Sequence, residues 1–255
     1  MSTLFTSIVV GNDGTPSSLA ALAKAQQLAA GDARLVAVSV VEEHLAAHAG
    51  ANAPAVAADL RADAEATAAR ARELTAGMAG AEAVVVTGRA VETLHRLAEE
   101  RGADLIAVGN HGHGRLATIL IGSVSGEVLH AATRSVLVAR LGDGDRLARV
   151  VAGVDGSPAG AAALERARAI AAHAGVPLRI VAAGGGKGID AAALAAVDGV
   201  EQVAGGPVDA LLQGAGLDDL IVVGSRGLHG LKSLGSVSER VAHKAPCSVL
   251  VVHSG

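Results

Sequence analysis

Aromatic residues are almost missing from this sequence, which has no Trp, no Tyr and a single Phe, Phe5. Proteins that bind single-stranded nucleic acid stack the bases on aromatic side chains, and those platforms are not available here. Long runs of Lys and Arg are also missing, and the formal net charge is −4. A protein that neutralises a phosphate backbone needs a basic surface. We therefore expect no nucleic acid partner.

Cysteine is limited to one residue, Cys247, which excludes an intramolecular disulfide and favours a reducing compartment. Cys247 precedes the apolar run 248–252, where a small buried thiol is expected rather than a catalytic one. No apolar run approaches the ~20 residues that a membrane-spanning helix needs. Residues 1–10 lack the basic and apolar regions of a signal peptide. These absences predict a cytoplasmic protein with no membrane partner.

What the sequence does contain is an internal repeat, built largely from Ala, Val and Leu. The stretch 8–16 (IVVGNDGTP) is similar to 150–158 (VVAGVDGSP) in the second half. Three later stretches of the first half return in the same order in the second half. These pairs are 104–109 with 219–224, 122–125 with 235–238, and 135–138 with 248–251. The polar, turn-forming segment 142–145 separates the halves, so we place the domains at residues 1–141 and 147–255.

Each half alternates short aliphatic runs with Ala-rich stretches of helical periodicity. In the first half the runs lie near 7–10, 34–41, 83–87, 105–108 and 135–139, and the helical stretches at 16–30, 54–78, 90–101 and 123–133. Aliphatic runs separated by helices predict parallel strands that are covered on both faces. Thr15 and Ser157 each place a capping hydroxyl before a proline, as helix starts do. The second half lacks most of the long segment between its second and third strands.

Two segments of the first half have the character of a ligand site at the carboxyl ends of such strands. In the turn after the first strand, the carboxylate of Asp13 either accepts a hydrogen bond from a ligand amine or caps the following helix. Further on, Gly109 and Gly112 let the backbone approach a ligand. Gly122 and Ser123 then open a helix whose free N–H groups and positive dipole end attract phosphate. The alternative is a glycine-rich turn followed by an ordinary Ser cap.

This pattern closely resembles the universal stress protein family, whose hallmark is Gly, two residues, Gly, nine residues and then Gly-Ser or Gly-Thr. Gly109, Gly112, Gly122 and Ser123 match that spacing, and the resemblance covers essentially the whole chain, twice. It implies an α/β fold of two tandem Rossmann-like, adenine nucleotide-binding domains. Each would hold a five-stranded parallel sheet of order 3-2-1-4-5 with helices on both faces. The resemblance also implies ATP binding, with Mg²⁺ on the phosphates.

The resemblance further implies which residues hold ATP in the first half. Asp13 and Val40 would hold the adenine, Val40 through its backbone at the end of the second strand. The glycine-rich segments would hold the ribose and phosphates, with Val124 and Ser125 adding backbone N–H and hydroxyl contacts. The full set of binding residues is Gly11, Asp13, Val40, Gly109, His111, Gly112, Arg115, Gly122, Ser123, Val124 and Ser125.

The second half keeps a weaker version of the site, consisting of Asp155, Gly224, Gly227, Gly235 and Ser236. Only seven residues separate Gly227 from Gly235, where the first copy has nine. A loop that surrounds phosphates spans up to ~6–7 Å less when it is two residues shorter. We therefore expect one ATP per chain, bound in the first half.

Three other motifs do not complete a site. The stretch 184–188 (GGGKG) looks like a P-loop, but Lys187 is followed by Gly instead of Ser or Thr, and the leading Gly is misplaced. No GxGxxG follows either first strand. His111 and His113 lack the Cys or carboxylate cluster of a metal site. We therefore expect no metal ligands among the protein's own side chains.

No motif in the sequence marks a strong enzyme, because no nucleophile has an evident base and no carboxylates are paired at a glycine loop. We expect a stress or regulatory protein that acts by nucleotide-dependent binding, with a ligand-free interaction module or a slow ATPase as alternatives. The implied order places the strands at 135–138 and 248–251 at sheet edges, and open aliphatic edges invite pairing. We expect the two halves to pair through these strands, and a further homodimer is compatible with the sequence.

Overall fold

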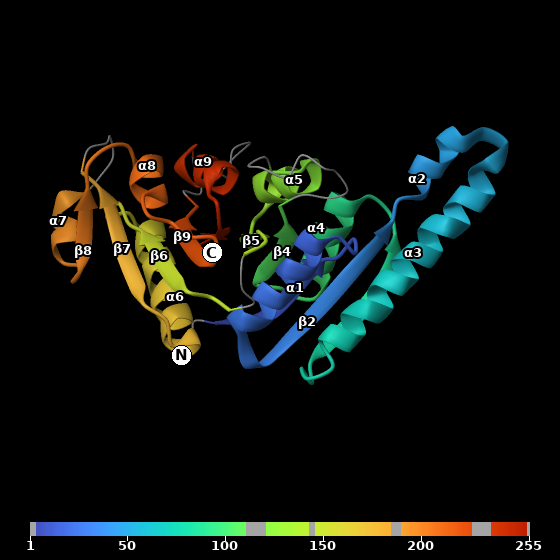
Figure 1. The fold of residues 1–255 in the computed structure, drawn as a ribbon, viewed down its shortest axis with the longest axis horizontal. Coiled ribbons are helices and arrows are strands. Elements are labelled where there is room, and N and C mark those ends of the chain that lie inside the picture. Colours follow the sequence, from blue (N-terminus) through green and yellow to red (C-terminus); the bar gives the residue numbers. More distant parts are fainter. Residues whose placement is uncertain (1–3, 111–120, 143–145, 185–189, 226–235, 254–255) are drawn as a thin grey trace.

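The computed structural model describes residues 4–110, 121–142, 146–184, 190–225 and 236–253. They form one ten-stranded sheet of order β3-β2-β1-β4-β5-β10-β9-β6-β7-β8 (Figure 1). The strands are β1 Phe5–Gly11, β2 Ala29–Val41, β3 Ala81–Thr87, β4 Leu105–Gly109, β5 Ser135–Ala139, β6 Arg149–Gly153, β7 Leu178–Ala183, β8 Val200–Val203, β9 Asp219–Gly224 and β10 Ser248–Val252. Within each half the order is 3-2-1-4-5 with parallel neighbours, so the predicted fold class is confirmed.

Helices cover both faces of this sheet, as the continuous aliphatic strands predicted. The helical elements are α1 Pro16–Leu28, α2 Glu43–Ala46, the 3₁₀ helix η1 Ala47–Asn52, α3 Ala53–Leu74, α4 Ala90–Glu100, α5 Ser123–Ala131, α6 Pro158–Ala174, α7 Ala191–Ala195, α8 Pro207–Leu212 and α9 Ser236–Lys244. One apolar core joins α1, α3, α6 and α7 to the sheet, and the other joins α4, α5, α8 and α9. Successive strand residues point to opposite faces, so there is one core on each face of the sheet. Each core runs through both halves because the sheet is continuous.

The predicted helix caps form in both halves. Thr15 and Ser157 accept hydrogen bonds from the backbone N–H groups of Ser18 and Gly160, and a proline follows each cap residue. The helix expected at 16–30 ends at Leu28, and the strand that follows begins at Ala29 rather than near 34. Among the described residues, none of the helices combines the length and hydropathy that a membrane span requires.

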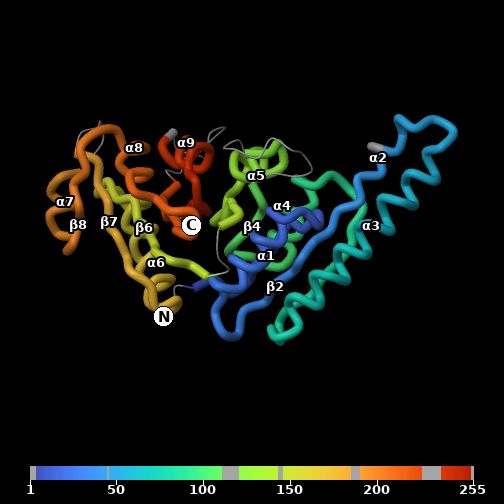
Figure 2. Tube along the Cα trace, in the orientation of Figure 1, coloured from blue at the N-terminus to red at the C-terminus, as the bar shows by residue number. Residues whose placement is uncertain are grey.

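The two halves meet at β5 and β10, which pair antiparallel while the other neighbours run parallel. Figure 2 shows the first half, blue to green, beside the second half, yellow to red, with the C-terminal end of the chain at their junction. The junction is nearly symmetric. The N–H of Arg140 donates to Ser248 Oγ at 3.1 Å, and the N–H of His253 donates to Ser135 Oγ at 3.3 Å.

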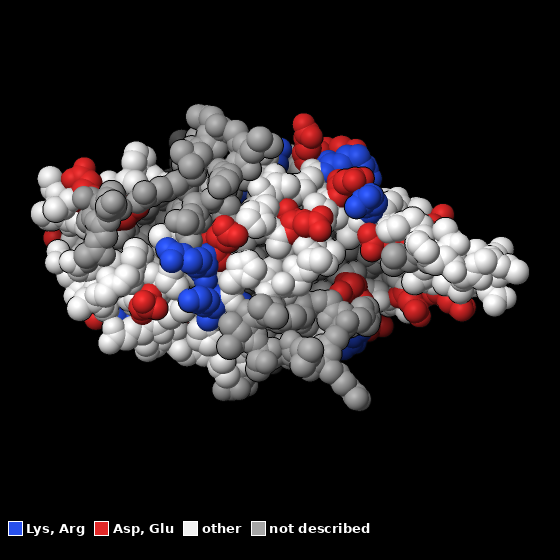
Figure 3. Space-filling model, turned by 90° about the horizontal axis from the view of Figure 1, so that it is seen from above, with Lys and Arg blue, Asp and Glu red and all other residues white. Residues whose placement is uncertain are grey.

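A projecting helical arm distinguishes the first half from the second. We define the arm as residues 43–66, which comprise α2, η1 and the part of α3 before Thr67. It extends beyond the edge of the sheet (Figure 1). Viewed from above, its surface is largely uncharged with acidic side chains along one edge (Figure 3). In the second half the corresponding helix is the short α7.

Candidate functional site

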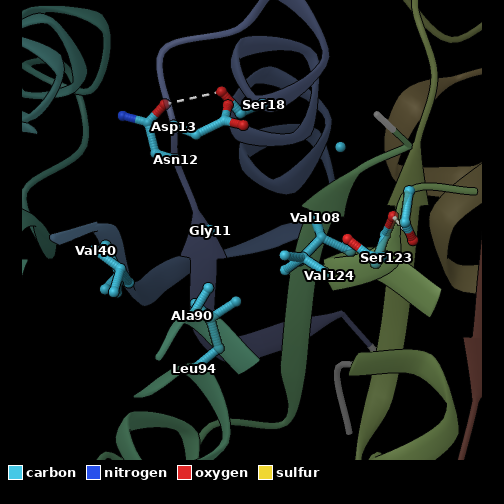
Figure 4. Close-up of a pocket in the computed structure, with 14 residues that line it drawn as sticks. Gly11, Asn12, Asp13, Ser18, Val40, Ala90, Leu94, Val108, Ser123 and Val124 are labelled. Carbon is cyan, nitrogen blue, oxygen red and sulfur yellow. Dashed lines mark hydrogen bonds between the residues drawn. The ribbon is translucent and has the colours of Figure 1, made fainter. Parts of the chain in front are cut away.

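A pocket lies at the carboxyl ends of β1, β2 and β4, between the starts of α1, α4 and α5 (Figure 4). This is the edge of a parallel sheet where ligands bind, close to the point where the strand order reverses. The pocket is lined by Gly11, Asn12, Asp13, Ser18, Val38, Val40, Ala90, Leu94, Val108, Gly109, Gly122, Ser123, Val124 and Ser125. Segments more than 100 residues apart in the chain thus contribute to one site.

The pocket brings together most of the residues that the sequence singled out. Those present are Gly11, Asp13, Val40, Gly109, Gly122, Ser123, Val124 and Ser125. His111, Gly112 and Arg115 lie outside the described residues. The sequence interpretation missed Asn12, Ser18, Val38, Ala90, Leu94 and Val108. Val38 and Val108 could have been found, because each precedes a predicted site residue on its strand; nothing in the sequence ties α4 to the pocket.

Asp13 takes part in the turn that starts α1. Its Oδ1 accepts hydrogen bonds from the N–H of Thr15 at 3.0 Å and from Thr15 Oγ at 2.6 Å. Thr15 in turn caps α1 by accepting from the N–H of Ser18 at 3.3 Å. Asp13 is exposed, and among the described residues its Oδ2 has no partner. The two roles weighed for this carboxylate are therefore compatible, because one oxygen holds the turn and the other faces outward.

The backbone of Val40 borders the pocket because β1 ends before β2 does. The last residue of β1, Gly11, lies opposite Val38, and the N–H of Asn12 donates to the Val38 carbonyl at 2.9 Å. One residue beyond Val40, the Val41 carbonyl accepts from the N–H of Gly88 on the β3 side, at 3.1 Å. Since backbone groups alternate in direction along a strand, the N–H and C=O of Val40 point toward the β1 side, past the end of that strand.

One of the predicted glycines, Gly109, is required by packing around the pocket, and Gly11 is in closer contact than usual. A Cβ on Gly109 would lie 2.6 Å from the backbone carbon of Ser17, so the glycine lets α1 rest directly on the end of β4. A Cβ on Gly11 would lie 3.1 Å from Leu94 Cδ1, a side chain that can yield. Gly109 therefore shapes the site through the helix that packs on it, in addition to lining the pocket.

Among the described residues, the first N–H groups of α5, at the edge of the pocket, have no hydrogen-bond partner. Gly122 is the cap residue and has no side chain to bond the first N–H groups of the helix. Its own N–H donates to the Asn110 carbonyl at 2.6 Å. The Ser125 hydroxyl donates to the carbonyls of Gly122 and Asn110 at 3.2 and 3.3 Å. Ser125 therefore anchors α5 to the end of β4, and the positive end of the helix faces the pocket.

His95 joins the two helices on either side of the pocket. It lies on α4, next to Leu94, and forms a hydrogen bond with the backbone of Val128 on α5. Burial lowers the pKa of His95 below its ordinary 6.5, and the bond to Val128 opposes this change. The imidazole is therefore neutral at physiological pH. The described part of the chain contains no group of three His, Cys, Asp or Glu residues that could hold a metal ion.

The second half repeats the scaffold with different details. Asp155 Oδ1 accepts from the N–H of Ser157 at 3.0 Å and from Ser157 Oγ at 2.5 Å, as Asp13 does from Thr15. Gly224 repeats the close approach of Gly109, because a Cβ there would collide with the Ala159 carbonyl. Ser236 is the first residue of α9, whereas Gly227 and Gly235 lie outside the described residues.

Comparison with known proteins points to one family. The sequence profile of the Universal stress protein family matches residues 4–140 and 191–253. Over 142 residues the chain is 34% identical to Universal stress protein Rv1636 of Mycobacterium tuberculosis. The matched region is 52% of this chain and 95% of that protein.

Solved structures show the same architecture over almost the whole chain. A universal stress protein from Archaeoglobus fulgidus superposes with a TM-score of 0.63 at 24% identity, over 98% of this chain and 96% of that one. A protein of unknown function from Pseudomonas aeruginosa superposes with a TM-score of 0.69 at 20% identity, over 98% and 93%. These two likenesses support the two-domain fold.

Proposed function

This chain belongs to the universal stress protein family, and we propose that its first half binds ATP and acts by nucleotide-dependent binding rather than by turnover. One observation carries the proposal. Among the described residues, the pocket brings together Asp13 Oδ2, which accepts no hydrogen bond there, the backbone edge of Val40, which has no strand partner, and the start of α5, which has no capping side chain. Hydrogen-bonding groups for a base thus lie at one end and donors for phosphate at the other.

The adenine is proposed to lie against β2, on the side of Val40. The backbone N–H and C=O of Val40 match the donor and acceptor edge of a base, and Asp13 Oδ2 can accept from an exocyclic amine. The aliphatic side chains of Val38, Val40, Leu94 and Val108 line the pocket and can cover the faces of the ring. The chain offers aliphatic rather than aromatic packing, in keeping with its composition.

The phosphates are proposed to lie at the start of α5. The N–H groups of Ser123 and Val124 belong to the first helical turn, which has free donors and the positive dipole end. Gly109 and Gly122 line the pocket without side chains. His111, Gly112 and Arg115 belong to the connecting segment and would complete the phosphate site. Mg²⁺ would bind to the phosphate oxygens, since hard cations prefer oxygen ligands.

Binding without fast turnover is favoured by the chemistry of the lining. Among the described residues of the pocket, Asp13 is the only ionisable side chain, and it lies at the end proposed for the base. A hydrolytic enzyme needs a group that activates water next to the γ-phosphate. A slow ATPase and a ligand-free interaction module remain the alternatives.

The second half is proposed to bind nucleotide weakly or not at all. Its shorter glycine spacing stands beside two further differences, Val154 in place of Asn12 and the short α7 in place of the arm. We also propose domain limits of 1–141 and 147–255, halves that stay paired through β5 and β10 in solution, and a cytoplasmic location. A homodimer built on other surfaces is compatible with this arrangement.

Nucleotide release and titration test the proposal. The purified chain, denatured by heat, should release bound adenine nucleotide, and the refilled protein should bind MgATP near one per chain by calorimetry. Asp13→Ala should weaken binding by about 1–3 kcal/mol, the cost of leaving a ligand donor without its partner. Asp155→Ala is the matched control and should leave affinity nearly unchanged.

Gly122→Val tests the phosphate end separately. The backbone of Gly122 has φ −64° and ψ 163°, which valine adopts without strain, so the fold should persist. The added side chain should block the approach of phosphate to α5 and abolish MgATP binding. Unchanged affinity in Gly122→Val would remove the proposed site, and accumulation of ADP over many turnovers would favour the ATPase.

A further inference from the structure

The side chain of Asn12 is a buried polar group in the turn beside Asp13, with 2% of its surface exposed. Its Oδ1 accepts from Ser18 Oγ at 3.2 Å (Figure 4). The same atom accepts from the N–H of Gly14 at 3.4 Å. Its Nδ2 donates to the carbonyl of Thr67, in the middle of α3, at 3.4 Å. One amide thus connects the ligand turn, the start of α1 and the helix that carries the arm.

The turn and α3 are also in direct steric contact. Gly14 has φ +78°, a conformation that favours glycine, and a Cβ there would lie 2.8 Å from Thr67 Oγ1. Closely packed groups transmit displacement because interiors have little free space. A ligand that moves or stiffens the Asn12–Asp13 turn therefore acts on α3 at Thr67.

The base of the arm is attached to the pocket rim at two more points. Glu42, just before the arm, accepts through Oε1 from the N–H of Ala90, a pocket residue, at 3.0 Å. Arg61 Nη2 donates to Glu43 Oε1 at 2.8 Å and to Thr87 Oγ1 at the end of β3, at 3.0 Å. The first of these contacts reaches the pocket at Ala90, and the second holds the arm to the end of β3.

Beyond these attachments the arm is weakly held. None of the residues of η1 is buried, and among the described side chains of the arm only Ala46 of α2 and Ala64 of α3 are buried. Segments with few buried contacts open locally at low free energy cost. The order of the arm therefore depends on the contacts at its base.

The second half supplies an internal comparison. Its described residues form no arm, and Val154 occupies the position of Asn12. There the N–H of Asp190 donates to the Asp155 carbonyl at 2.9 Å, and the Asp190 side chain caps the short α7. The polar link is present in the half that carries the arm and replaced by an apolar residue in the half that does not.

We propose that Asn12 is a positioning residue that couples occupancy of the pocket to the order of the arm at residues 43–66, so that the arm reports the bound nucleotide. This inference rests on the proposed nucleotide binding of the first half and assigns the readout of that same site. The hydrogen bond from Asn12 Nδ2 to the Thr67 carbonyl links the pocket to α3. The bonds that Asn12 Oδ1 accepts keep the turn in its conformation.

Hydrogen–deuterium exchange of the full chain tests the coupling. Saturating MgATP should slow exchange in peptides from the arm by about two- to tenfold, the effect of one hydrogen bond on a local opening. Asn12→Asp keeps the acceptor for Gly14 and Ser18 but loses the donor to Thr67. It should speed exchange in the arm without nucleotide, a readout that does not depend on binding, and it should remove the slowing at MgATP concentrations that calorimetry shows to saturate the variant. Ser18→Ala, the matched control, should leave the nucleotide-free exchange of the arm unchanged.

The possible outcomes separate this inference from the proposed function. If the wild-type chain binds MgATP and the arm exchanges at the same rate with and without it, the coupling is wrong and the binding function stands. If the wild-type chain does not bind MgATP, both are overturned. An Asn12→Asp variant with the wild-type arm response also overturns the role of Asn12. Should Asn12→Asp not fold, Asn12→Val replaces it, because the second half folds with valine at this position.

Discussion

Gly109 offers the sharpest test of how the pocket is built, because its side-chain hydrogen faces the backbone of α1. In Gly109→Ala the new Cβ would lie 2.6 Å from the Ser17 carbonyl carbon, 2.7 Å from Ser17 Cβ and 2.8 Å from Ser17 O. Ordinary contacts between carbon atoms lie near ~3.5–4 Å. Helix α1 must therefore retreat from β4 by about 1 Å, or the strand must distort.

The cost of this retreat follows from what α1 buries. Ala21, Leu22, Ala25 and Leu28 on its inner face are each at most 2% exposed, so a shift loosens a packed interface along the helix. Overpacking of this kind costs about 1–3 kcal/mol, and we expect the upper end because the obstacle is backbone. Gly31→Ala is the control, since a Cβ there meets nothing within 4 Å. It should be neutral or stabilise by up to about 1 kcal/mol.

The free energies of unfolding should be measured in urea by far-UV circular dichroism, because the chain has no Trp or Tyr to report by fluorescence. Both Gly109→Ala and its counterpart Gly224→Ala should shift the midpoint downward. Gly109→Ala should also weaken MgATP binding, whereas Gly224→Ala should not. If Gly109→Ala is as stable as the wild type and only binding suffers, the packing argument is refuted and the glycine serves ligand approach alone.

Three further predictions concern the junction and the titrating groups. Burial raises the pKa of Cys247 to about 12, so a thiol reagent at about pH 8 should label it only in urea; rapid labelling of the native chain would contradict its burial. Arg140→Met should lower the free energy of unfolding by about 2–3 kcal/mol, because Arg140 Nη2 donates to the carbonyls of Ala242 and His243 across the junction; an unchanged urea midpoint would show that these bonds contribute nothing. Burial also lowers the pKa of His95 in the native chain from 6.5. Between that lowered pKa and 6.5 the unfolded chain binds a proton that the native chain does not. The free energy of unfolding should therefore fall as the pH decreases through this range. Urea midpoints at about pH 7.5 and 5.5 should differ less in His95→Gln than in the wild type, and an equal difference would count against this assignment.

The predictability of the site varied with the distance over which its residues interact. Gly11, Asp13, Gly109 and Gly122 stand at strand ends or helix starts, and such positions follow from hydrophobic runs and cap residues within one segment. Ala90 and Leu94 line the same pocket but were not predicted. They reach it because α4 packs beside β1 and because Glu42, 48 residues earlier, caps its first N–H. No local pattern carries that information.

The arm shows the same limit. A helix was expected near 54–78, and α3 spans Ala53–Leu74, since Ala-rich periodicity is a local property. That this helix begins on a projecting arm, and that Thr67 rests on Gly14 and Asn12, depends on the path of α2 and η1 away from the sheet.

The sequence by itself determined the repeat, the strand and helix order of each half and the positions at which α1, α5, α6 and α9 begin. These follow from apolar periodicity, caps and glycine spacing, which act over a few residues. Only the tertiary structure decided that the backbone of α1 packs directly on Gly109. The same holds for the position of Val40 past the end of β1 and for the hydrogen bond by which Asn12 connects the pocket to α3. Each of these depends on where two elements distant in the sequence meet, and such contacts are set by packing of the whole domain rather than by the propensities of either segment.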